Sequence, residues 1–136
     1  MTKAREVMTK GAEFIESKTT VVEAAKKLKE LDVGSLPICD GGKLKGMVTD
    51  RDIVVKVLAA GKDPGECTVG ELIQGEAVTI GADDDIDLAI KTMGEHQVRR
   101  LPVIDGTDLV GIVSQADIAR SMPERKVGEL VEAISV

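Results

Sequence analysis

The stretch that decides the fold is GMVTDRDI at residues 46–53, which recurs as GIVSQADI at residues 111–118. Each copy reads as a short apolar strand that ends on a hydroxyl residue, with an aspartate three residues later in the first turn of a helix. The pairs are Thr49 with Asp52, and Ser114 with Asp117. The pattern therefore predicts, twice, a strand-to-helix corner that places a hydroxyl beside an acid.

The repeat extends well beyond these two stretches. When residues 4–53 are aligned without a gap on residues 69–118, sixteen of fifty positions are identical. Similarity at one fixed offset indicates an internal duplication. We therefore divide the chain into repeat 1, residues 1–66, and repeat 2, residues 67–136. Each repeat alone is too short to bury much apolar surface, so the two are expected to pack face to face across a cleft.

Both repeats show the same order of periodic segments. In repeat 1, apolar residues at helical spacing predict a helix that begins after Thr20 and ends at Gly34. A hairpin with its turn at residues 40–42 follows, and after the corner comes a second amphipathic helix. The apolar side of that helix is expected to consist of Ile53, Val54, Val57 and Leu58.

The predicted fold class is mixed α/β (α+β). Two βαββα repeats are expected to be related by a pseudo-twofold axis. A short leading helix over residues 3–8 and a closing helix near residues 127–131 complete the prediction. The closing helix is expected because residues 127–131 resemble residues 69–73.

Composition excludes several functional classes. The net charge of -6 and the pI near 4.9 argue against a nucleic acid partner, which requires a basic face. Phe14 is the only aromatic residue, so bases have no stacking platform. The N-terminus lacks the apolar core of a signal peptide, and no apolar run approaches the roughly 18 residues of a membrane span. We expect a cytoplasmic protein in which Cys39 and Cys67 are reduced thiols.

The whole chain resembles a tandem pair of cystathionine-β-synthase (CBS) domains, often called a Bateman module. The resemblance rests on residues 36–38 (LPI) with 46–53, and on residues 101–103 (LPV) with 111–118. The stretches DRDIV, LAAG and HQVRRLPV are most similar to stand-alone bacterial pairs of the hypoxic response protein type. The resemblance implies a module that binds an adenosine nucleotide in the cleft and regulates rather than catalyses.

The two corners have a structural interpretation and a functional one. A hydroxyl at the N-cap and an acid at the third helical position stabilise a helix start by themselves. The same carboxylate can accept hydrogen bonds from both ribose hydroxyls, while the hydroxyl and the free helix N–H groups face phosphate. The resembled family holds its ribose at this position, and the two roles can coexist. We therefore name Thr49, Asp52, Ser114 and Asp117 as nucleotide-binding candidates.

The surroundings of the two corners differ. Arg99 and Arg100 precede the LPV stretch of repeat 2, whereas glycine and serine precede LPI in repeat 1. Arginine suits phosphate because its planar fork engages two oxygens, although a solvated surface pair is the alternative. Arg100 matches a phosphate-binding position in similar modules, so an anionic ligand is expected to prefer its pocket. The backbone around Ile38, Ile80 and Val103 is expected to wall the base.

No metal is expected. His96 aligns with Leu31 of the matching helix and is expected to be packed or partly buried. One cysteine and one histidine do not complete a tetrahedral zinc site, but a twofold dimer would supply Cys39 and His96 from each chain, and this alternative stays open. The acidic run at residues 83–85 lacks the alternating pattern of a calcium loop and is interpreted as negative charge at a helix start.

Enzyme motifs are absent from the sequence. The glycines at 41 and 46 have a Walker-like interval, but Met47 stands where a P-loop needs lysine. The leading hypothesis is a stand-alone regulatory module: a homodimer that requires no cofactor, binds AMP, ADP, ATP or a related adenosyl ligand, and signals to an unknown protein effector. The alternative is a stress-associated structural or interaction protein whose clefts are ligand-poor.

Overall fold

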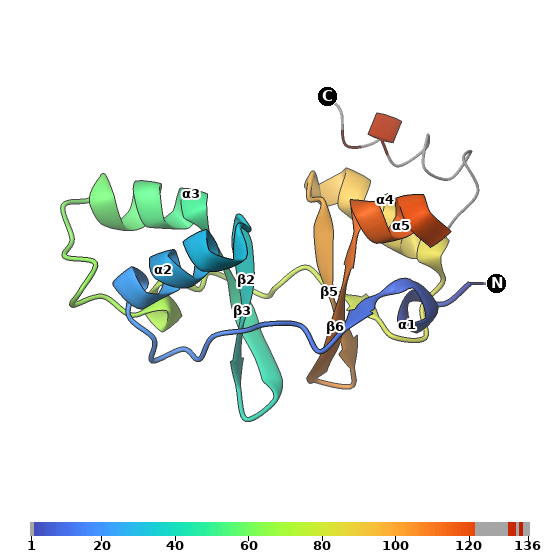
Figure 1. Cartoon of the computed structure of the whole chain (residues 1–136), viewed down its shortest axis with the longest axis horizontal. Helices are drawn as coiled ribbons and strands as arrows, with labels where there is room; N and C mark the ends of the chain where they lie inside the picture. Colours follow the sequence, from blue (N-terminus) through green and yellow to red (C-terminus); the bar gives the residue numbers. More distant parts are fainter. Residues whose placement is uncertain (1, 122–130, 133, 135–136) are drawn as a thin grey trace. The chain divides into compact units, whose positions relative to one another are not determined.

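The chain folds into two compact units. The computed structural model describes residues 2–121, 131, 132 and 134. One unit consists of residues 13–77, and the other joins residues 1–12 to residues 78–136. The predicted boundary between residues 66 and 67 divides the duplication in sequence, whereas in space the first twelve residues pack with repeat 2. Figure 1 labels the elements of both units.

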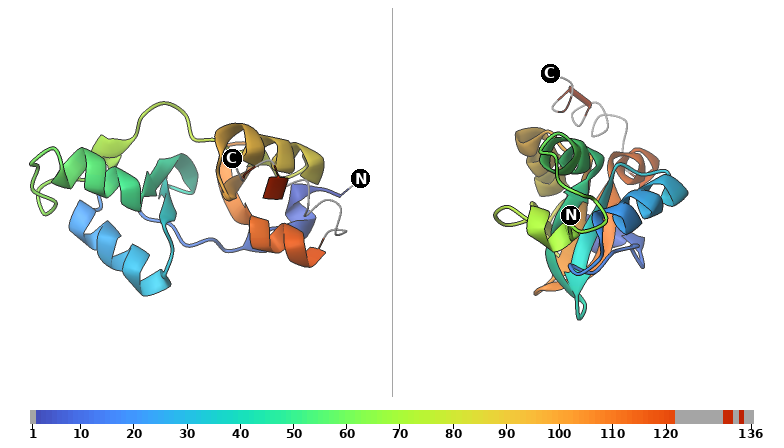
Figure 2. Two further views of the ribbon diagram at one scale, coloured as in Figure 1. Left: turned by 90° about the horizontal axis from the view of Figure 1, so that it is seen from above. Right: turned by 90° about the vertical axis from the view of Figure 1, so that its left-hand side faces the viewer.

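The unit of residues 13–77 is a hairpin with helices on one of its sides, as Figures 1 and 2 show. Its elements are α2 (Val21–Leu31), β2 (Ser35–Asp40), β3 (Lys43–Thr49), α3 (Asp50–Asp52), the π-helix η1 (Ile53–Leu58) and the 3-10 helix η2 (Val69–Leu72). β2 pairs antiparallel with β3, and the turn at Gly41 and Gly42 uses the positive φ angles that glycine adopts easily. The core lies between hairpin and helices and includes Val21, Leu28, Ile38, Val48 and Val57.

The other unit repeats this arrangement. Its elements are α1 (Ala4–Val7), β1 (Thr9–Lys10), β4 (Ile80–Gly81), α4 (Ile86–His96), β5 (Arg100–Asp105), β6 (Asp108–Ser114) and α5 (Gln115–Ser121). β5 pairs antiparallel with β6, β4 runs parallel to β5, and β1 pairs antiparallel with β6. The core includes Ile86, Met93, Leu101, Val113 and Ile118.

The structure confirms the mixed α and β fold class. α2 and α4, β2 and β5, and β3 and β6 each begin and end sixty-five residues apart. Even the ends of the helices match, because α2 and α4 both stop at a residue in the left-handed region, Asp32 and Gln97, each with φ of 53°. The prediction that Gly34 ends α2 was therefore wrong. The left-handed position at the end of each helix is occupied by a residue with a side chain and not by glycine.

The apolar side expected for the helix after the first corner needs correction. This helix is π-helical over Ile53–Leu58, with the Ala59 amide donating to the Val54 carbonyl at 2.8 Å. Only Ile53 and Val57 are buried, whereas Val54 and Leu58 are more than half exposed at 55% and 56%. The buried face of the helix is therefore narrower than its apolar face.

The leading helix expected over residues 3–8 is present as α1. The closing helix expected at residues 127–131 lies, apart from Val131, outside the described residues. Within the described part of the chain, no helix is long and apolar enough to cross a membrane.

The leading segment of each repeat packs on the body of the other repeat. The Ala4 and Arg5 amides donate to the carbonyls of Asp84 and Ala82, both at 2.9 Å. In the other unit, the Val69 and Gly70 amides donate to the carbonyls of Thr19 and Ser17, also at 2.9 Å. These four bonds are equivalent under the sixty-five-residue offset. Each repeat therefore packs its leading segment on the body of the other repeat, and the two segments are exchanged. The leading segments are residues 4–12 and residues 69–77.

The exchange requires a glycine where each leading segment crosses a hairpin strand. A Cβ at Gly111 would lie 2.7 Å from the Thr9 carbonyl oxygen and 2.6 Å from the Met8 sulfur. A Cβ at Gly46 would meet only side-chain carbons of Ile73, at 3.0–3.3 Å. The approach at Gly111 involves backbone, which cannot turn away as a side chain does.

Gly111→Ala is therefore expected to destabilise the protein more than Gly46→Ala. The methyl group at residue 111 must push β1 away from β6, and overpacking of this kind costs about 1–3 kcal/mol. Urea unfolding followed by far-UV circular dichroism measures the difference, since the chain has no tryptophan or tyrosine for fluorescence. Equal stability of the two variants would contradict the close approach of β1.

Candidate functional site

The first corner is a complete capping box. The Thr49 hydroxyl accepts a hydrogen bond from the Asp52 amide at 3.0 Å, and the Thr49 amide donates to Asp52 Oδ2 at 3.0 Å. Lys56, one turn further along, lies with its Nζ 3.2 Å from Asp52 Oδ1 and also donates to the Leu72 carbonyl at 3.4 Å. The Asp52 side chain remains 22% exposed. The Asp52 carboxylate is thus partly accessible from solvent, and its Oδ1 is paired with a single flexible ammonium group.

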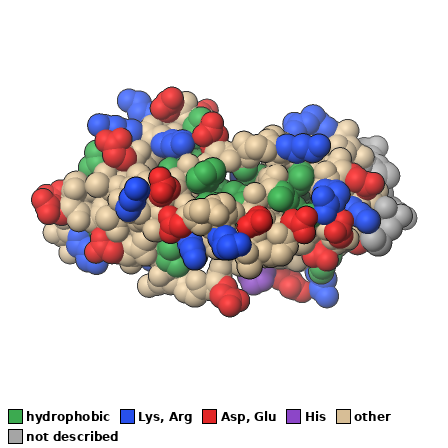
Figure 3. All heavy atoms as spheres, turned by 90° about the horizontal axis from the view of Figure 1, so that it is seen from below, with side chains coloured by type: hydrophobic (Ala, Val, Ile, Leu, Met, Phe, Trp, Pro, Cys, Tyr) green, Lys and Arg blue, Asp and Glu red, His purple; other side chains and the backbone are tan. Residues whose placement is uncertain are grey.

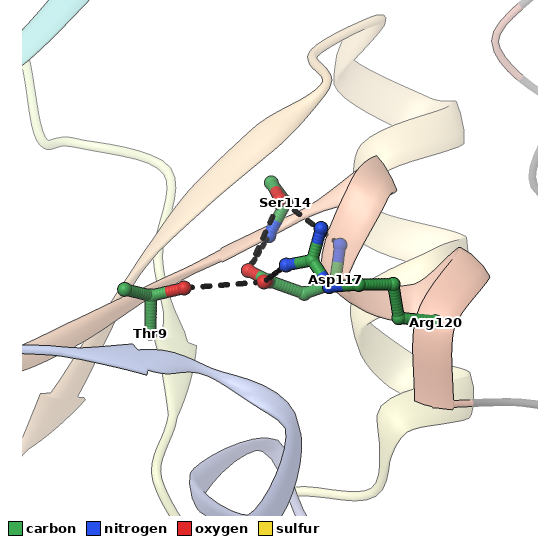
Figure 4. Close-up of polar contacts among 4 residues, drawn as sticks. All are labelled: Thr9, Ser114, Asp117 and Arg120. Carbon is green, nitrogen blue, oxygen red and sulfur yellow. Dashed lines mark hydrogen bonds and ion pairs between the residues drawn. The ribbon is translucent and has the colours of Figure 1, made fainter.

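The second corner repeats the capping box and adds donors, as Figure 4 shows. The Ser114 hydroxyl accepts from the Asp117 amide at 3.1 Å, and the Ser114 amide and hydroxyl donate to Asp117 Oδ2 at 2.9 and 3.0 Å. Asp117 Oδ1 accepts from the Thr9 hydroxyl at 3.1 Å and from the Arg120 guanidinium. Only 5% of the Asp117 side chain is exposed. Asp117 is the one charged residue among those described that is buried.

Arg99 and Arg100 lie beside the second corner. Arg100 is opposite Ser114 in the register of β5 and β6, and the Arg99 carbonyl accepts from the Gln115 amide at 2.9 Å. Both arginine side chains are exposed. The first corner has Ser35 opposite Thr49 instead. Whether the arginines bind phosphate stays a prediction. The start of the second hairpin carries two positive charges that the start of the first hairpin lacks.

The residues expected to wall the base are core residues. Ile38 and Val103 are completely buried, and Ile80 is 2% exposed. Their side chains pack inside the separate cores of the two units. These values cover backbone and side chain together, so the three residues expose almost no surface, and a base-binding wall around them stays a prediction.

Three residues at the corners escaped the sequence prediction. Lys56 and Arg120 stand four and three residues after their aspartates, a spacing at which helical side chains meet. That signal was present in the sequence. Thr9 had no such signal, because it reaches Asp117 only through the exchange of the leading segment onto repeat 2.

The cysteines and the histidine do not form a site within either unit. Cys39 and Cys67 are free thiols, as expected; both are also buried, and burial raises the pKa of both thiols. His96 is exposed at the end of α4, so the expectation that it is packed was wrong: in the last helical turn its polar ring stays in water. No group of three or more histidine, cysteine or acidic side chains that could hold a metal occurs in the described residues.

The acidic run at residues 83–85 serves local structure, as predicted for a helix start. Asp85 caps α4 by accepting from the Asp87 amide at 3.0 Å. Asp83 accepts from Arg5 at 2.8 Å, and this bond together with the guanidinium charge lowers the pKa of Asp83. The run therefore joins the leading segment to α4.

Comparison with known proteins places the chain in a family. The family model described as "CBS domain" matches residues 4–59 and again residues 69–124. The chain belongs to the CBS domain family, with two copies of the domain.

Relatives share nearly the full length. Hypoxic response protein 1 of Mycobacterium tuberculosis (strain H37Rv) is 47% identical over 135 residues, which cover 98% of this chain and 94% of the relative. A crystal structure of Hypoxic Response Protein I with two coordinated zinc ions is 48% identical, with a TM-score of 0.83 and coverage of 90% of this chain and all of that one. The CBS domain pair of protein MJ0100, solved with 5′-methylthioadenosine and S-adenosyl-L-methionine, is 32% identical, with a TM-score of 0.74 over 88% of this chain and 94% of that one.

Asp117→Asn is expected to lower the free energy of unfolding by about 1–3 kcal/mol, because an amide cannot accept from all the donors that converge on the buried carboxylate. The matched change Asp52→Asn should have a smaller effect, since Asp52 is partly solvated. Urea unfolding at neutral pH measures both variants. A larger effect at residue 52 would contradict the difference in burial between the corners.

Proposed function

We propose that this protein is a regulatory CBS pair that binds an adenosine nucleotide or a related adenosyl ligand. The observation that carries the proposal is the duplicated corner, where the carboxylates of Asp52 and Asp117 are held in the same orientation by Thr49 and Ser114. A carboxylate fixed in this way can accept both hydroxyls of a ribose. The crystal structure of the MJ0100 pair with two adenosyl compounds supports this ligand class.

The rest of the ligand is assigned to neighbouring groups. Arg100, with Arg99 beside it, would engage phosphate oxygens near the second corner, because Arg100 lies opposite Ser114 in the sheet. Backbone groups around Ile38, Ile80 and Val103 would contact the base. Elsewhere on the surface, Figure 3 shows acidic and basic side chains interspersed among the described residues on the face that it draws. That distribution favours a small anion over a polyanion.

The proposed regulatory role requires thermodynamic linkage between ligand binding and partner binding. A bound ligand changes a partner's affinity only if it binds two conformations of the protein differently. We infer that the protein acts as a cytoplasmic homodimer that transmits its ligand state to a protein effector, and that it catalyses no reaction. It requires no resident cofactor in this proposal.

The alternative, a structural or interaction protein with ligand-poor sites, has one observation in its favour. Every buried side-chain nitrogen or oxygen among the described residues already has a hydrogen-bond partner. The buried carboxylate of the second corner therefore has its hydrogen-bond partners without a ligand. Absence of binding by any adenosyl compound would favour this alternative.

Calorimetric titration with AMP, ADP, ATP and S-adenosylmethionine is expected to show saturable binding. Asp52→Ala should abolish or weaken by at least about tenfold one class of sites, since a charged hydrogen bond is lost. Asp50→Ala is the matched control, because it removes an exposed carboxylate from the same helical turn. Equal losses in the two variants would count against a specific role for Asp52.

Arg100→Ala is expected to weaken AMP binding by about tenfold through loss of a charge-assisted contact with phosphate. Adenosine, which has no phosphate, should bind the variant and the unchanged protein equally well. The same titration measures both ligands, with Lys91→Ala as a charge-matched control on α4. Unchanged AMP affinity would overturn the assignment of Arg100.

A further inference from the structure

The second corner has no free acceptor for a ligand. A carboxylate offers about four lone-pair sites, and Asp117 receives four donors from the chain itself. Ligand hydroxyls can be accepted there only if some of these donors leave. The proposed function therefore implies an exchange of hydrogen bonds at Asp117, and the structure indicates which bonds are exchanged.

The donors on the two oxygens differ in how firmly they are held. Oδ2 is bonded by Ser114, whose amide and hydroxyl belong to the capping box. Oδ1 is bonded by Thr9 and Arg120, and neither residue takes part in the cap. The Arg120 side chain is 67% exposed and can return to water at little cost. Oδ1, which Figure 4 shows between Thr9 and Arg120, is therefore the oxygen that a ligand hydroxyl can take.

Thr9 connects this oxygen to the leading segment. β1 lies on β6 with Thr9 opposite Ile112 and Lys10 opposite Gly111. At its other end the segment is fixed independently, because Arg5 bonds Asp83 at 2.8 Å and its amide donates to the Ala82 carbonyl. β1 and α1 are thus held by different contacts.

The first corner has no equivalent of this arrangement. Under the sixty-five-residue offset, Val55 stands at the position of Arg120 and Gln74 at that of Thr9. Asp52 pairs with Lys56 instead, and Lys56 bonds the Leu72 carbonyl. The side chain of valine has no donor for a carboxylate. The two repeats therefore differ in sequence at these positions, and the Thr9 and Arg120 contacts are particular to the second corner.

We propose that Thr9 and Arg120 form a latch on the second corner, so that ligand binding at Asp117 releases β1 from β6. This inference rests on the proposed function, because it concerns the same ribose-binding carboxylate. Thermodynamic linkage is reciprocal: if the ligand opens the latch, weakening the latch must tighten binding. The pairing of the leading segment with β6 then depends on whether the second corner holds a ligand.

The test uses the full chain with Asp52→Ala as background, so that calorimetry with AMP reports on the second corner alone. Adding Arg120→Ala is expected to tighten AMP binding by about three- to tenfold. Thr9→Val, which keeps a β-branched side chain without the hydroxyl, should act in the same direction. Lys91→Ala removes one positive charge from the same unit and should leave the affinity unchanged.

Hydrogen exchange of the individual backbone amides of residues 4–10, measured by NMR, provides a second measurement. In the Asp52→Ala protein, AMP should speed exchange at Thr9 and Lys10 without changing exchange at Arg5. In the Thr9→Val protein this exchange should already be fast, and AMP should add little. Circular dichroism confirms that each variant is folded.

The outcomes separate the latch from the proposed function. If the unaltered protein binds no adenosyl ligand, the proposed function fails and the latch fails with it. If AMP binds but Arg120→Ala and Thr9→Val leave the affinity equal or weaker, and β1 exchange does not respond to AMP, the latch is overturned while the proposed function stands. If the Asp52→Ala protein does not bind AMP, binding must reappear when Arg120→Ala is added. Its absence there also overturns the latch.

Discussion

The hydrogen bonds between a strand-end hydroxyl residue and an aspartate three residues later organise each half of this protein. At both corners the carboxylate accepts from the amide at the end of the strand, and the hydroxyl accepts from the amide of the aspartate. The chain can turn from strand to helix only in the direction that this reciprocal pair allows. Hairpin and helices then enclose the core on one side. The candidate ligand-binding groups are thus the same atoms that stabilise the turn.

Much of the fold and of the two corners was predictable from the sequence, because the duplication presents each local sequence pattern twice. The order of helix, hairpin and corner in each repeat follows from residues that recur at one offset, whereas the end of α2 was predicted at the wrong residue. Residues whose environment depends on distant segments were not predictable. Thr9 meets Asp117 only because the leading segments are exchanged, and no pattern near Thr9 indicates that. His96 aligned with an apolar position, yet a polar ring in the last turn of a helix stays in solvent.

The π-helix shows a different limit of sequence analysis. Ile53, Val54, Val57 and Leu58 have ordinary helical spacing, which predicts one apolar face. Only Ile53 and Val57 are buried, while Val54 and Leu58 are more than half exposed. Periodicity marks an apolar stripe but does not indicate how much of its width the neighbouring elements cover.

The exchange of leading segments also determines when each unit can be completed during synthesis. Residues 13–77 are contiguous, so that unit has all of its parts once residue 77 has been made. The other unit joins β1 to β6, so that Thr9 pairs with Ile112, which lies 103 positions later in the chain. Closing so long a loop is slow relative to local pairing. Residues 4–12 are therefore expected to pack later than the elements of residues 13–77, although they precede those elements in the chain.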